Sequence, residues 1–407
     1  MDKKILFLFV LIIGCNNKNK FSINDWAYYR GDNHVSHYKP YNHINKDNVH
    51  KLKKSWVYNG NDFDPENRSQ IQCNPLIIDG VLYGTSPKMK LFALDASNGK
   101  KLWEFDPYDG KYSSHGTGVN RGLNYYRSSK GDRILYATYS KLYAVNPENG
   151  TLINSFGNNG VIDLKKGLGR NVDNMLLAAN TPGVIYKNLL IIGHRASEST
   201  GAVPGHIRAF DVMSGKIKWT FHTIPYPGEY GYDTWPQDSY LKSGGANAWA
   251  GLSLDENNEI VYVPTGSAAF DYYGGDRKGA NLFANSIIAL DANNGNRIWH
   301  FQTIHHDIWD RDLPAAPNLV TVMKNGNKID GLVQISKSGY LFVFDRITGE
   351  PIYPIKEKKV PSSKLFGEFA WPTQPVPTVY PPFSRSSFSE EDLPIRTDKV
   401  KFHTKEI

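Results

Sequence analysis

Cysteine is almost absent from this chain, with two residues among 407. Cys15 ends an apolar N-terminal segment, which leaves Cys73 as the only cysteine in the rest of the sequence. One cysteine cannot build a disulfide framework, and the chain contains no Cys-x-x-Cys-His motif for haem attachment. The sequence therefore excludes a disulfide-rich fold and a covalently attached haem.

Long apolar runs and long basic runs are also missing after residue 15. No later apolar stretch approaches the roughly 18 residues that a membrane-spanning helix needs. The formal net charge is +7, and the lysines and arginines are scattered along the chain. Binding to nucleic acid is therefore not expected, whereas an anionic ligand or an anionic membrane surface fits the charge.

The N-terminus has the features of a bacterial lipoprotein signal. A basic start precedes nine apolar residues, 5–13, and then Gly14-Cys15. Nine residues are too few to cross a bilayer but suit the core of a signal peptide. We expect a signal peptide at 1–14, a tether at 15–25 and a lipid anchor on Cys15, at the periplasmic side of a bacterial membrane. The alternative is a secretory signal followed by a cysteine by chance.

One motif recurs five times after this segment. In each copy alternating apolar residues lead to an Asp or Asn, and a Gly follows four positions later. The copies span residues 91–105, 142–156, 207–221, 287–301 and 341–355. In three copies a tryptophan follows the glycine by four positions, at Trp103, Trp219 and Trp299. Asn154 and Tyr353 take that place in the second and fifth copies.

The parts of the motif predict a β-hairpin. The alternation indicates a half-buried strand, the acidic residue accepts N–H groups of a turn, and the glycine supplies a positive φ. The tryptophan begins the next strand and offers a flat surface to a neighbouring unit. Partner strands are expected upstream, within 74–86, 133–145 and 259–267. Repeated units of four strands predict an all-β chain folded as a β-propeller of four-stranded blades, because separate sandwiches would not explain the constant spacing.

The intervals between copies predict where a site is built. A bare blade needs about 40–50 residues, and the intervals 146–211 and 211–291 are longer. Their inserted loops are expected to carry function. After about residue 355 the sequence becomes proline-rich and then charged, so we expect a propeller that lacks its last blades at the C-terminus.

Four further segments follow in a fixed order: VNRGLNYY, GANAWAG, HHDIWDRDLPA and KSGYLFVFDR. With the repeat, they make the chain similar to the quinoprotein dehydrogenases, most closely the membrane-linked glucose and polyol branch. The similarity runs over residues 26–385, and we assign 26–407 to the propeller domain. It implies an eight-bladed propeller that binds pyrroloquinoline quinone (PQQ) and oxidises a sugar, polyol or related alcohol. Electrons would pass to a membrane quinone or to a separate cytochrome.

The resemblance also implies roles for single residues. Asp310 matches the base that takes the hydroxyl proton of the substrate, and Lys337 matches a cation beside the quinone oxygen. Trp249 matches the floor on which the cofactor ring stacks, and Arg121 matches a contact to its carboxylates. The histidine that some members place four residues before that arginine is replaced by Thr117, and His115 nearby receives no role.

A hard cation, Ca²⁺ or alternatively Mg²⁺, is implied as well. Its implied ligands are Glu198, Ser267 and Asp310, with Glu198 also near the cofactor. Ser267 stands where alcohol dehydrogenases of the family have an asparagine, which is a departure from the pattern. His305 and His306 are not expected to share a transition metal, because neighbouring residues of a strand face opposite sides. Together with Asp307 they are interpreted as orienting Asp310 and closing its loop.

Two other interpretations stay open from the sequence. One is a non-enzymatic propeller lipoprotein, similar to the outer-membrane assembly lipoprotein that shares the repeat. The other is a truncated and inactive dehydrogenase, or one half of a split enzyme.

Overall fold

The computed structural model describes residues 21–66, 69–112, 119–385, 389–392, 397, 400 and 402. The predicted signal peptide, Cys15 and most of the predicted tether lie outside these residues, as do His115 and Thr117. The described residues include the helical elements η1 (Val49–Lys51), η2 (Tyr232–Thr234), α1 (Ser239–Lys242) and η3 (Glu390–Asp392), and Val400 and Phe402 are also helical. In the described part of the chain, no helix is long and apolar enough to cross a membrane.

Four antiparallel sheets of four strands follow one another along the chain. The first holds β1 (Leu76–Ile78), β2 (Val81–Thr85), β3 (Leu91–Asp95) and β4 (Lys101–Phe105). The second holds β5 (Asn124–Tyr126), β6 (Arg133–Thr138), β7 (Lys141–Val145) and β8 (Val161–Asp163). The third holds β10 (Val184–Tyr186), β11 (Leu189–Ile192), β13 (Ile207–Asp211) and β14 (Ile217–Phe221). The fourth holds β16 (Ser253–Asp255), β17 (Ile260–Pro264), β19 (Ser286–Asp291) and β20 (Arg297–Gln302).

A fifth sheet contains three strands, β21 (Asn318–Lys324), β22 (Asn327–Ile335) and β23 (Leu341–Asp345). Three two-stranded ribbons complete the described strands. They pair β9 (Leu177–Ala178) with β12 (Arg195–Ala196), β15 (Gly244–Gly245) with β18 (Ala268–Ala269), and β24 (Ile355–Lys359) with β25 (Thr373–Pro377).

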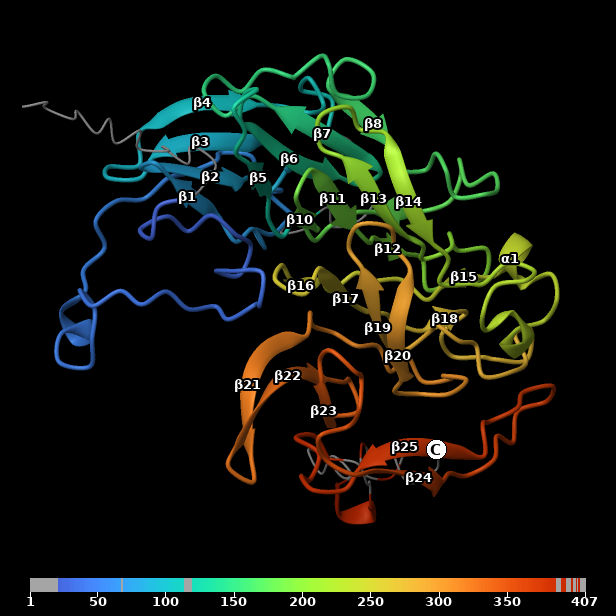
Figure 1. Ribbon diagram of the computed structural model, residues 1–407. Helices are drawn as coiled ribbons and strands as arrows, with labels where there is room; N and C mark the ends of the chain where they lie inside the picture. Colours follow the sequence, from blue (N-terminus) through green and yellow to red (C-terminus); the bar gives the residue numbers. More distant parts are fainter. Residues whose placement is uncertain are drawn as a thin grey trace, which may run out of the picture.

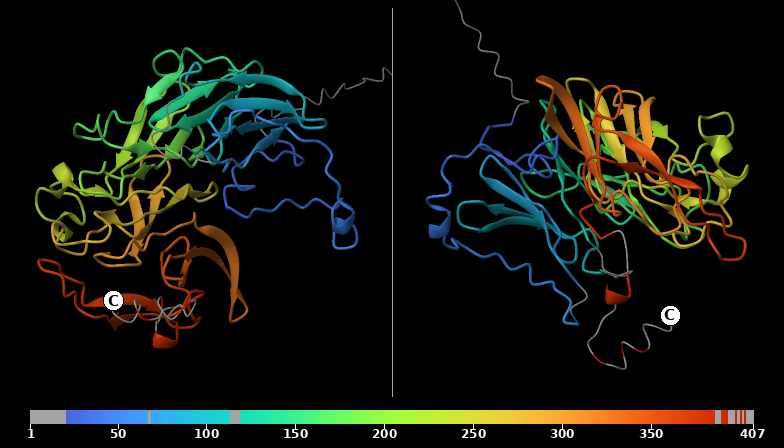
Figure 2. Two further views of the ribbon diagram at one scale, coloured as in Figure 1. Left: turned by 180° about the vertical axis from the view of Figure 1, so that it is seen from behind. Right: turned by 90° about the horizontal axis from the view of Figure 1, so that it is seen from below.

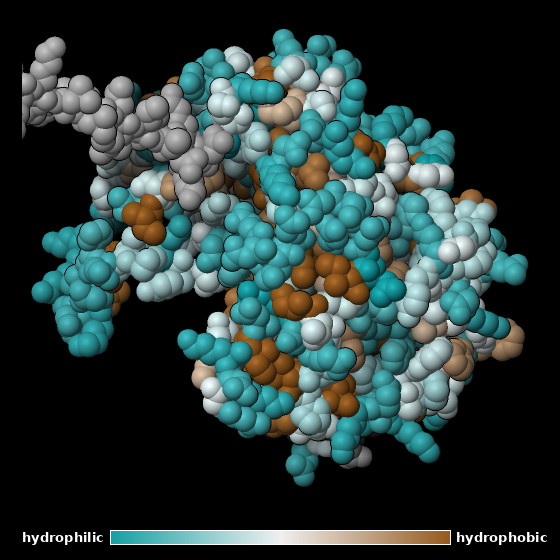
Figure 3. Space-filling view, in the orientation of Figure 1, coloured by the Kyte–Doolittle hydropathy of each residue, from teal (hydrophilic) through white to brown (hydrophobic). Residues whose placement is uncertain are grey.

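The sheets are arranged in an arc from cyan through green and yellow to orange (Figure 1), and the other views keep this order (Figure 2). The first strands of neighbouring sheets lie next to one another, β5 with β10, β10 with β16 and β16 with β21. Four hydrophobic cores each lie between two sheets: Leu76 and Leu91 of the first, for example, pack with Ile134 and Tyr143 of the second. This arrangement confirms the predicted β-propeller of four-stranded blades. In the space-filling view, hydrophobic side chains reach the surface mainly over the fourth and fifth sheets (Figure 3).

The tryptophan of one sheet packs on the glycine turn of the next sheet. A Cβ atom added to Gly295 would lie 2.5 Å from Cε3 of Trp219, and the indole N–H of Trp219 donates to the carbonyl oxygen of Ala292 at 3.3 Å. The same two contacts join Trp103 to Gly150 and Pro147, and Trp299 to Gly349 and Arg346. The predicted packing between neighbouring units is therefore confirmed.

The first turn receives its tryptophan from outside the repeat. The ring of Trp56 packs against Gly99, and its N–H donates to the carbonyl oxygen of Ala96 at 3.2 Å. The sequence motif gave no sign of this contact, because Trp56 lies before the first copy.

The second copy of the motif does not form the expected hairpin. Leu152 makes only a single bridge with Val145, and the fourth strand is β8, further along the chain. The hairpin predicted over 142–156 is therefore wrong in its second strand. Because Asn154 replaces the tryptophan, Arg133 of β6 makes the cross-sheet bond instead, donating to the carbonyl oxygen of Val212 at 2.9 Å.

The fifth copy also departs from the predicted hairpin over 341–355. Pro351 makes a single bridge with Phe344, and β24 pairs with β25 instead of β23. Proline has no N–H to donate to a strand ladder, so the second strand of this hairpin cannot continue.

The glycine turns can be tested with a matched pair of substitutions. Gly295 and Gly326 have φ values of +77° and +80°, but only Gly295 has a neighbouring side chain in the way, since nothing lies within 4 Å at Gly326. Both Gly295→Ala and Gly326→Ala should lower the free energy of unfolding by about 1 kcal/mol through backbone strain. Gly295→Ala should lose a further 1–3 kcal/mol, roughly, through its clash with Trp219. Urea unfolding measures the difference, and equal losses would contradict the packing role.

Candidate active site

A cavity of about 330 Å³ lies where loops from the second to the fifth sheet meet. Trp249 and Ser267 line it, together with six charged residues: Arg121, Arg195, Glu198, Asp271, Asp312 and Lys337. Arg121 precedes β5, Glu198 follows β12, Asp271 follows β18 and Lys337 lies between β22 and β23. Residues that are far apart in the sequence therefore share one wall.

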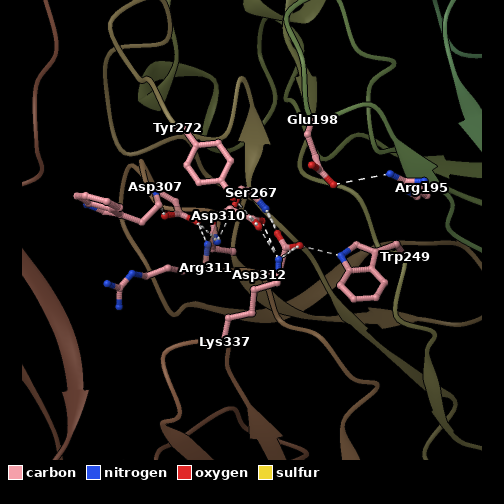
Figure 4. A network of polar contacts seen from close by, with 12 residues as sticks. Arg195, Glu198, Trp249, Ser267, Tyr272, Asp307, Asp310, Arg311, Asp312 and Lys337 are labelled. Carbon is pink, nitrogen blue, oxygen red and sulfur yellow. Dashed lines mark hydrogen bonds and ion pairs between the residues drawn. The ribbon is translucent and has the colours of Figure 1, made fainter. Parts of the chain in front are cut away.

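Lys337 joins two aspartates of the loop after β20. Its ammonium nitrogen lies 2.8 Å from both carboxylate oxygens of Asp310 and 3.0 Å from Oδ2 of Asp312 (Figure 4). The backbone strengthens this link, because the N–H of Lys337 donates to the carbonyl oxygen of Asp312 at 3.1 Å. The structure thus brings together the two residues that the sequence named as catalytic, although 27 positions separate them.

Burial and the ion pair shift the pKa values of Asp310 and Lys337 in opposite directions. Burial raises the pKa of Asp310 above its ordinary 3.8, and Asp312 raises it further, whereas the hydrogen bond and charge of Lys337 lower it. Burial by itself lowers the pKa of Lys337, but hydrogen bonds and ion pairs with both aspartates outweigh it, so the pKa rises. The arrangement holds a charged lysine against a carboxylate of increased basicity. The side chain of Asp310 keeps 19% of its surface exposed, so it can reach a bound molecule.

Trp249 is fixed at the cavity wall by Asp312. Its indole N–H donates to Oδ2 of Asp312 at 3.0 Å, and its carbonyl oxygen accepts the hydroxyl of Thr181 at 2.7 Å. Two cations lie near its ring: the guanidinium carbon of Arg121 at 5.5 Å and Nζ of Lys337 at 6.0 Å from the ring centre. A flat surface with cations at its edges suits a flat aromatic anion such as PQQ.

Arg121 keeps its charge available to such a ligand. Its guanidinium donates to the side-chain oxygen atoms of Gln72 at 2.9 Å and Thr181 at 3.2 Å, and both are neutral. Burial lowers the pKa of Arg121 below its ordinary value. The residues of the cavity therefore fit a cofactor with several carboxylates.

Asp307, and not the histidines, organises the loop that carries Asp310. Its carboxylate accepts the backbone N–H groups of Trp309 at 2.9 Å and Arg311 at 2.6 Å, on either side of Asp310. It also accepts the amide of Asn285 at 2.8 Å and the hydroxyl of Ser267. Asp310 itself has a φ of +53°, which turns its side chain away from its neighbours along the chain.

The two histidines point elsewhere. Nδ1 of His305 lies 2.8 Å from the side-chain oxygen of Gln302 and its Nε2 lies 3.2 Å from Glu357. Nδ1 of His306 lies 2.7 Å from the carbonyl oxygen of Gly279. Their expected part in orienting Asp310 is therefore wrong, because the rings bind Gln302, Glu357 and Gly279 and not Asp310.

The implied cation ligands are each engaged by the protein. Glu198 lies 3.8 Å from Arg195 with 62% of its side chain exposed, and both oxygen atoms of Asp310 face Lys337. Ser267 donates its hydroxyl to Asp307 and accepts the amide of Asn285 at 3.2 Å. Among the described residues, no group of three or more His, Cys, Asp or Glu side chains is placed to hold a metal ion.

Two aspartates at the cavity wall were missed by the sequence analysis. Asp312 binds Trp249, Lys337 and, at 2.7 Å, the N–H of Ser267, and its only sequence signal is the Asp-x-Asp spacing with Asp310. Asp271 lines the cavity at 5% exposure, and burial together with Asp312 raises its pKa to about 8. An unpaired carboxylate at the cavity wall fits the neighbourhood of a hard cation.

Comparison with known proteins agrees with the family resemblance found in the sequence. The family model for PQQ, "Glucose/ethanol/alcohol dehydrogenase, beta-propeller domain", matches residues 26–406. A quinoprotein glucose dehydrogenase of Escherichia coli is 33% identical over 369 residues, which cover 86% of this chain and 46% of that protein. A quinate/shikimate dehydrogenase (quinone) of Acinetobacter baylyi is 30% identical over 398 residues, covering 91% and 48%.

Solved structures agree with these relatives. A quinohemoprotein alcohol dehydrogenase from Pseudomonas putida superposes with a TM-score of 0.70 at 26% identity, covering 83% of this chain and 50% of that one. A europium-containing methanol dehydrogenase shares the fold, with a TM-score of 0.68 at 20% identity over 88% and 62% of the two chains. The chain spans about half the length of the curated relatives it matches.

The central place of Asp312 can be tested by unfolding. Asp312→Ala removes the shared acceptor of Trp249, Ser267 and Lys337, and should lower the free energy of unfolding by about 2–4 kcal/mol. Asp330→Ala is the control, because Asp330 is 56% exposed and lies 3.6 Å from Arg346 at the surface. It should change stability by less than about 0.5 kcal/mol. Urea unfolding compares the two, and similar losses would show that Asp312 is not a structural centre.

Proposed function

Because the chain belongs to the PQQ-binding glucose/ethanol/alcohol dehydrogenase β-propeller family, we propose that it acts in the PQQ-dependent oxidation of a sugar, polyol or related alcohol. One observation carries the proposal. The Lys337–Asp310 ion pair stands beside a cavity walled by Trp249 and Arg121, so a base, a cation and a flat aromatic wall occur together.

Asp310 is the proposed general base. Oxidation of an alcohol removes the hydroxyl proton while a hydride leaves the adjacent carbon, so a carboxylate within reach of the hydroxyl lowers the barrier. Lys337 holds both oxygen atoms of Asp310 at 2.8 Å and thereby fixes its orientation. The ammonium group also offers positive charge at the place where a reduced quinone oxygen would carry negative charge.

The cofactor would lie against Trp249, with its carboxylates toward Arg121 and with Lys337 and Glu198 at its edge. Bound PQQ supplies the acceptor for the hydride. Asp312 fixes the positions of Trp249 and Lys337, because both bind the same oxygen of its carboxylate.

A hard cation near the same wall is part of the proposal. Ca²⁺, or alternatively Mg²⁺, would lie near Glu198, Ser267 and Asp310 and would polarise the cofactor carbonyl. Electrons would leave to a membrane quinone or to a separate cytochrome. We also propose that Cys15 anchors the chain to a lipid bilayer on the periplasmic side.

Removal of the base should abolish the reaction. Asp310→Asn keeps the shape of the side chain but cannot accept the hydroxyl proton, so kcat should fall by at least about 100-fold. Reduction of a dye by purified protein with PQQ, Ca²⁺ and a panel of sugars and alcohols measures this. Asp238→Asn serves as control, since Asp238 is an exposed partner of Lys242. Full activity of Asp310→Asn would refute the assigned base.

Removal of the lysine should shift the pH dependence. Asp310 must be ionised to act, so the rate rises with pH through its pKa. Lys337 lowers that pKa, and Lys337→Gln removes this influence. The acidic limb of the pH–rate profile should therefore move to higher pH, beyond any loss of kcat. Lys242→Gln, at an exposed pair, should leave the limb in place. If the acidic limb of the Lys337→Gln profile stays at the same pH or moves to lower pH, Lys337 does not lower the pKa of the catalytic base as proposed.

A further inference from the structure

Asp271 is a buried acid that has no hydrogen-bond or ion-pair partner in the described part of the chain. Only 5% of its surface is exposed, it faces the cavity, and it makes no hydrogen bond or ion pair with any described residue. A buried carboxylate without a partner is costly, and proteins usually pair it or place it against a cation. The position of Asp271 therefore calls for a partner from outside the chain.

The wall around Asp271 is rich in carboxylates. Its acidic neighbours are Asp312, Asp310, Glu198 and Asp307, and the cations near these acids include Lys337, Arg277 and Arg195. Lys337 is shared by two aspartates, and Arg277 gives its hydrogen bonds to Asn281 and to backbone oxygen atoms. None of these cations forms an ion pair with Asp271, so a divalent cation at this wall would stabilise its ionised form.

The hydroxyl group of Ser267 is a poor ligand for a cation, because its hydrogen-bonding capacity is already used. Its hydroxyl proton is donated to Asp307, and its oxygen already accepts the amide of Asn285. Four residues further along the same inserted loop, just after β18, Asp271 presents a free carboxylate to the same cavity. The loop thus carries the stronger oxygen donor at Asp271.

We infer that Asp271 supplies a carboxylate ligand for a divalent hard cation at this wall. The inference rests on the proposed function, which places a cation beside the cofactor, and it names the residue that binds it. Carboxylate oxygen is the donor that Ca²⁺ and Mg²⁺ prefer, and among the described residues no histidine or cysteine lines the cavity to favour a softer metal. Water, the cofactor and Asp310 would supply further oxygen atoms.

Calcium binding to the full-length chain tests this directly. Isothermal titration of chelator-treated protein with CaCl₂, with and without saturating PQQ, should give a Kd for the wild type. Asp271→Asn should weaken binding by about tenfold or more, since a direct ligand matters at least as much as the outer groups that tune metal affinity. Asp276→Asn is the matched control, because it makes the same change at an exposed position of the same loop. Its Kd should stay within about twofold of the wild type.

Two results would overturn the inference: no calcium binding by the wild type in either state, or a Kd for Asp271→Asn within twofold of the wild type. The melting temperature of the metal-free protein separates a ligand from a structural acid, because removing a carboxylate without a partner should not lower it. Asp271→Ser replaces Asp271→Asn if the latter fails to fold. Dye reduction is measured on the same samples. Calcium binding that depends on Asp271 without PQQ-dependent activity would overturn only the proposed function.

Discussion

The contact between a tryptophan and the glycine turn of the next sheet fixes how neighbouring sheets are placed. The indole fills the space that a side chain on the glycine would occupy, and its N–H binds a carbonyl oxygen of the same turn. Each sheet is thereby held at a set angle and distance from the previous one, and the first strands line the inner side of the arc. The loops at one end then converge on a common cavity. The precision of the site therefore depends on contacts that lie between the sheets and far from the chemistry.

Within the site, one ammonium group organises two aspartates with different tasks. Asp310 points into accessible space, whereas Asp312 faces Trp249 and the backbone of Ser267. Because both carboxylates share Lys337, a change at any of the three is felt by the others. The proposed base and the carboxylate that supports the aromatic wall are therefore coupled through the side chain of Lys337.

The sequence predicted the first strand and the turn of every copy because the turn has strict chemical requirements, but it predicted the second strand correctly in only three of the five copies. Asp310, Lys337 and Trp249 could be named because they stand in segments that resemble a known family. Asp271 and Asp312 could not, because a single carboxylate in an irregular loop has no periodic pattern, and its partners come from other sheets. The histidines misled for a related reason. Their chemistry suggests a metal or a catalytic role, while His305 binds its near neighbour Gln302, and the other partners, Glu357 and Gly279, lie in segments whose proximity only the fold creates.

Arg133 has a consequence for how such repeats diverge. It reaches from β6 to the carbonyl oxygen of Val212 and makes the bond that an indole makes elsewhere, while Ile162 and Phe156 fill the space beside Gly215. The groove between two sheets thus accepts any combination of a donor and an apolar filler of the right volume, even when they come from separate strands. A blade can therefore lack the tryptophan and still keep its place beside the next blade, because the turn that accepts the hydrogen bond is retained.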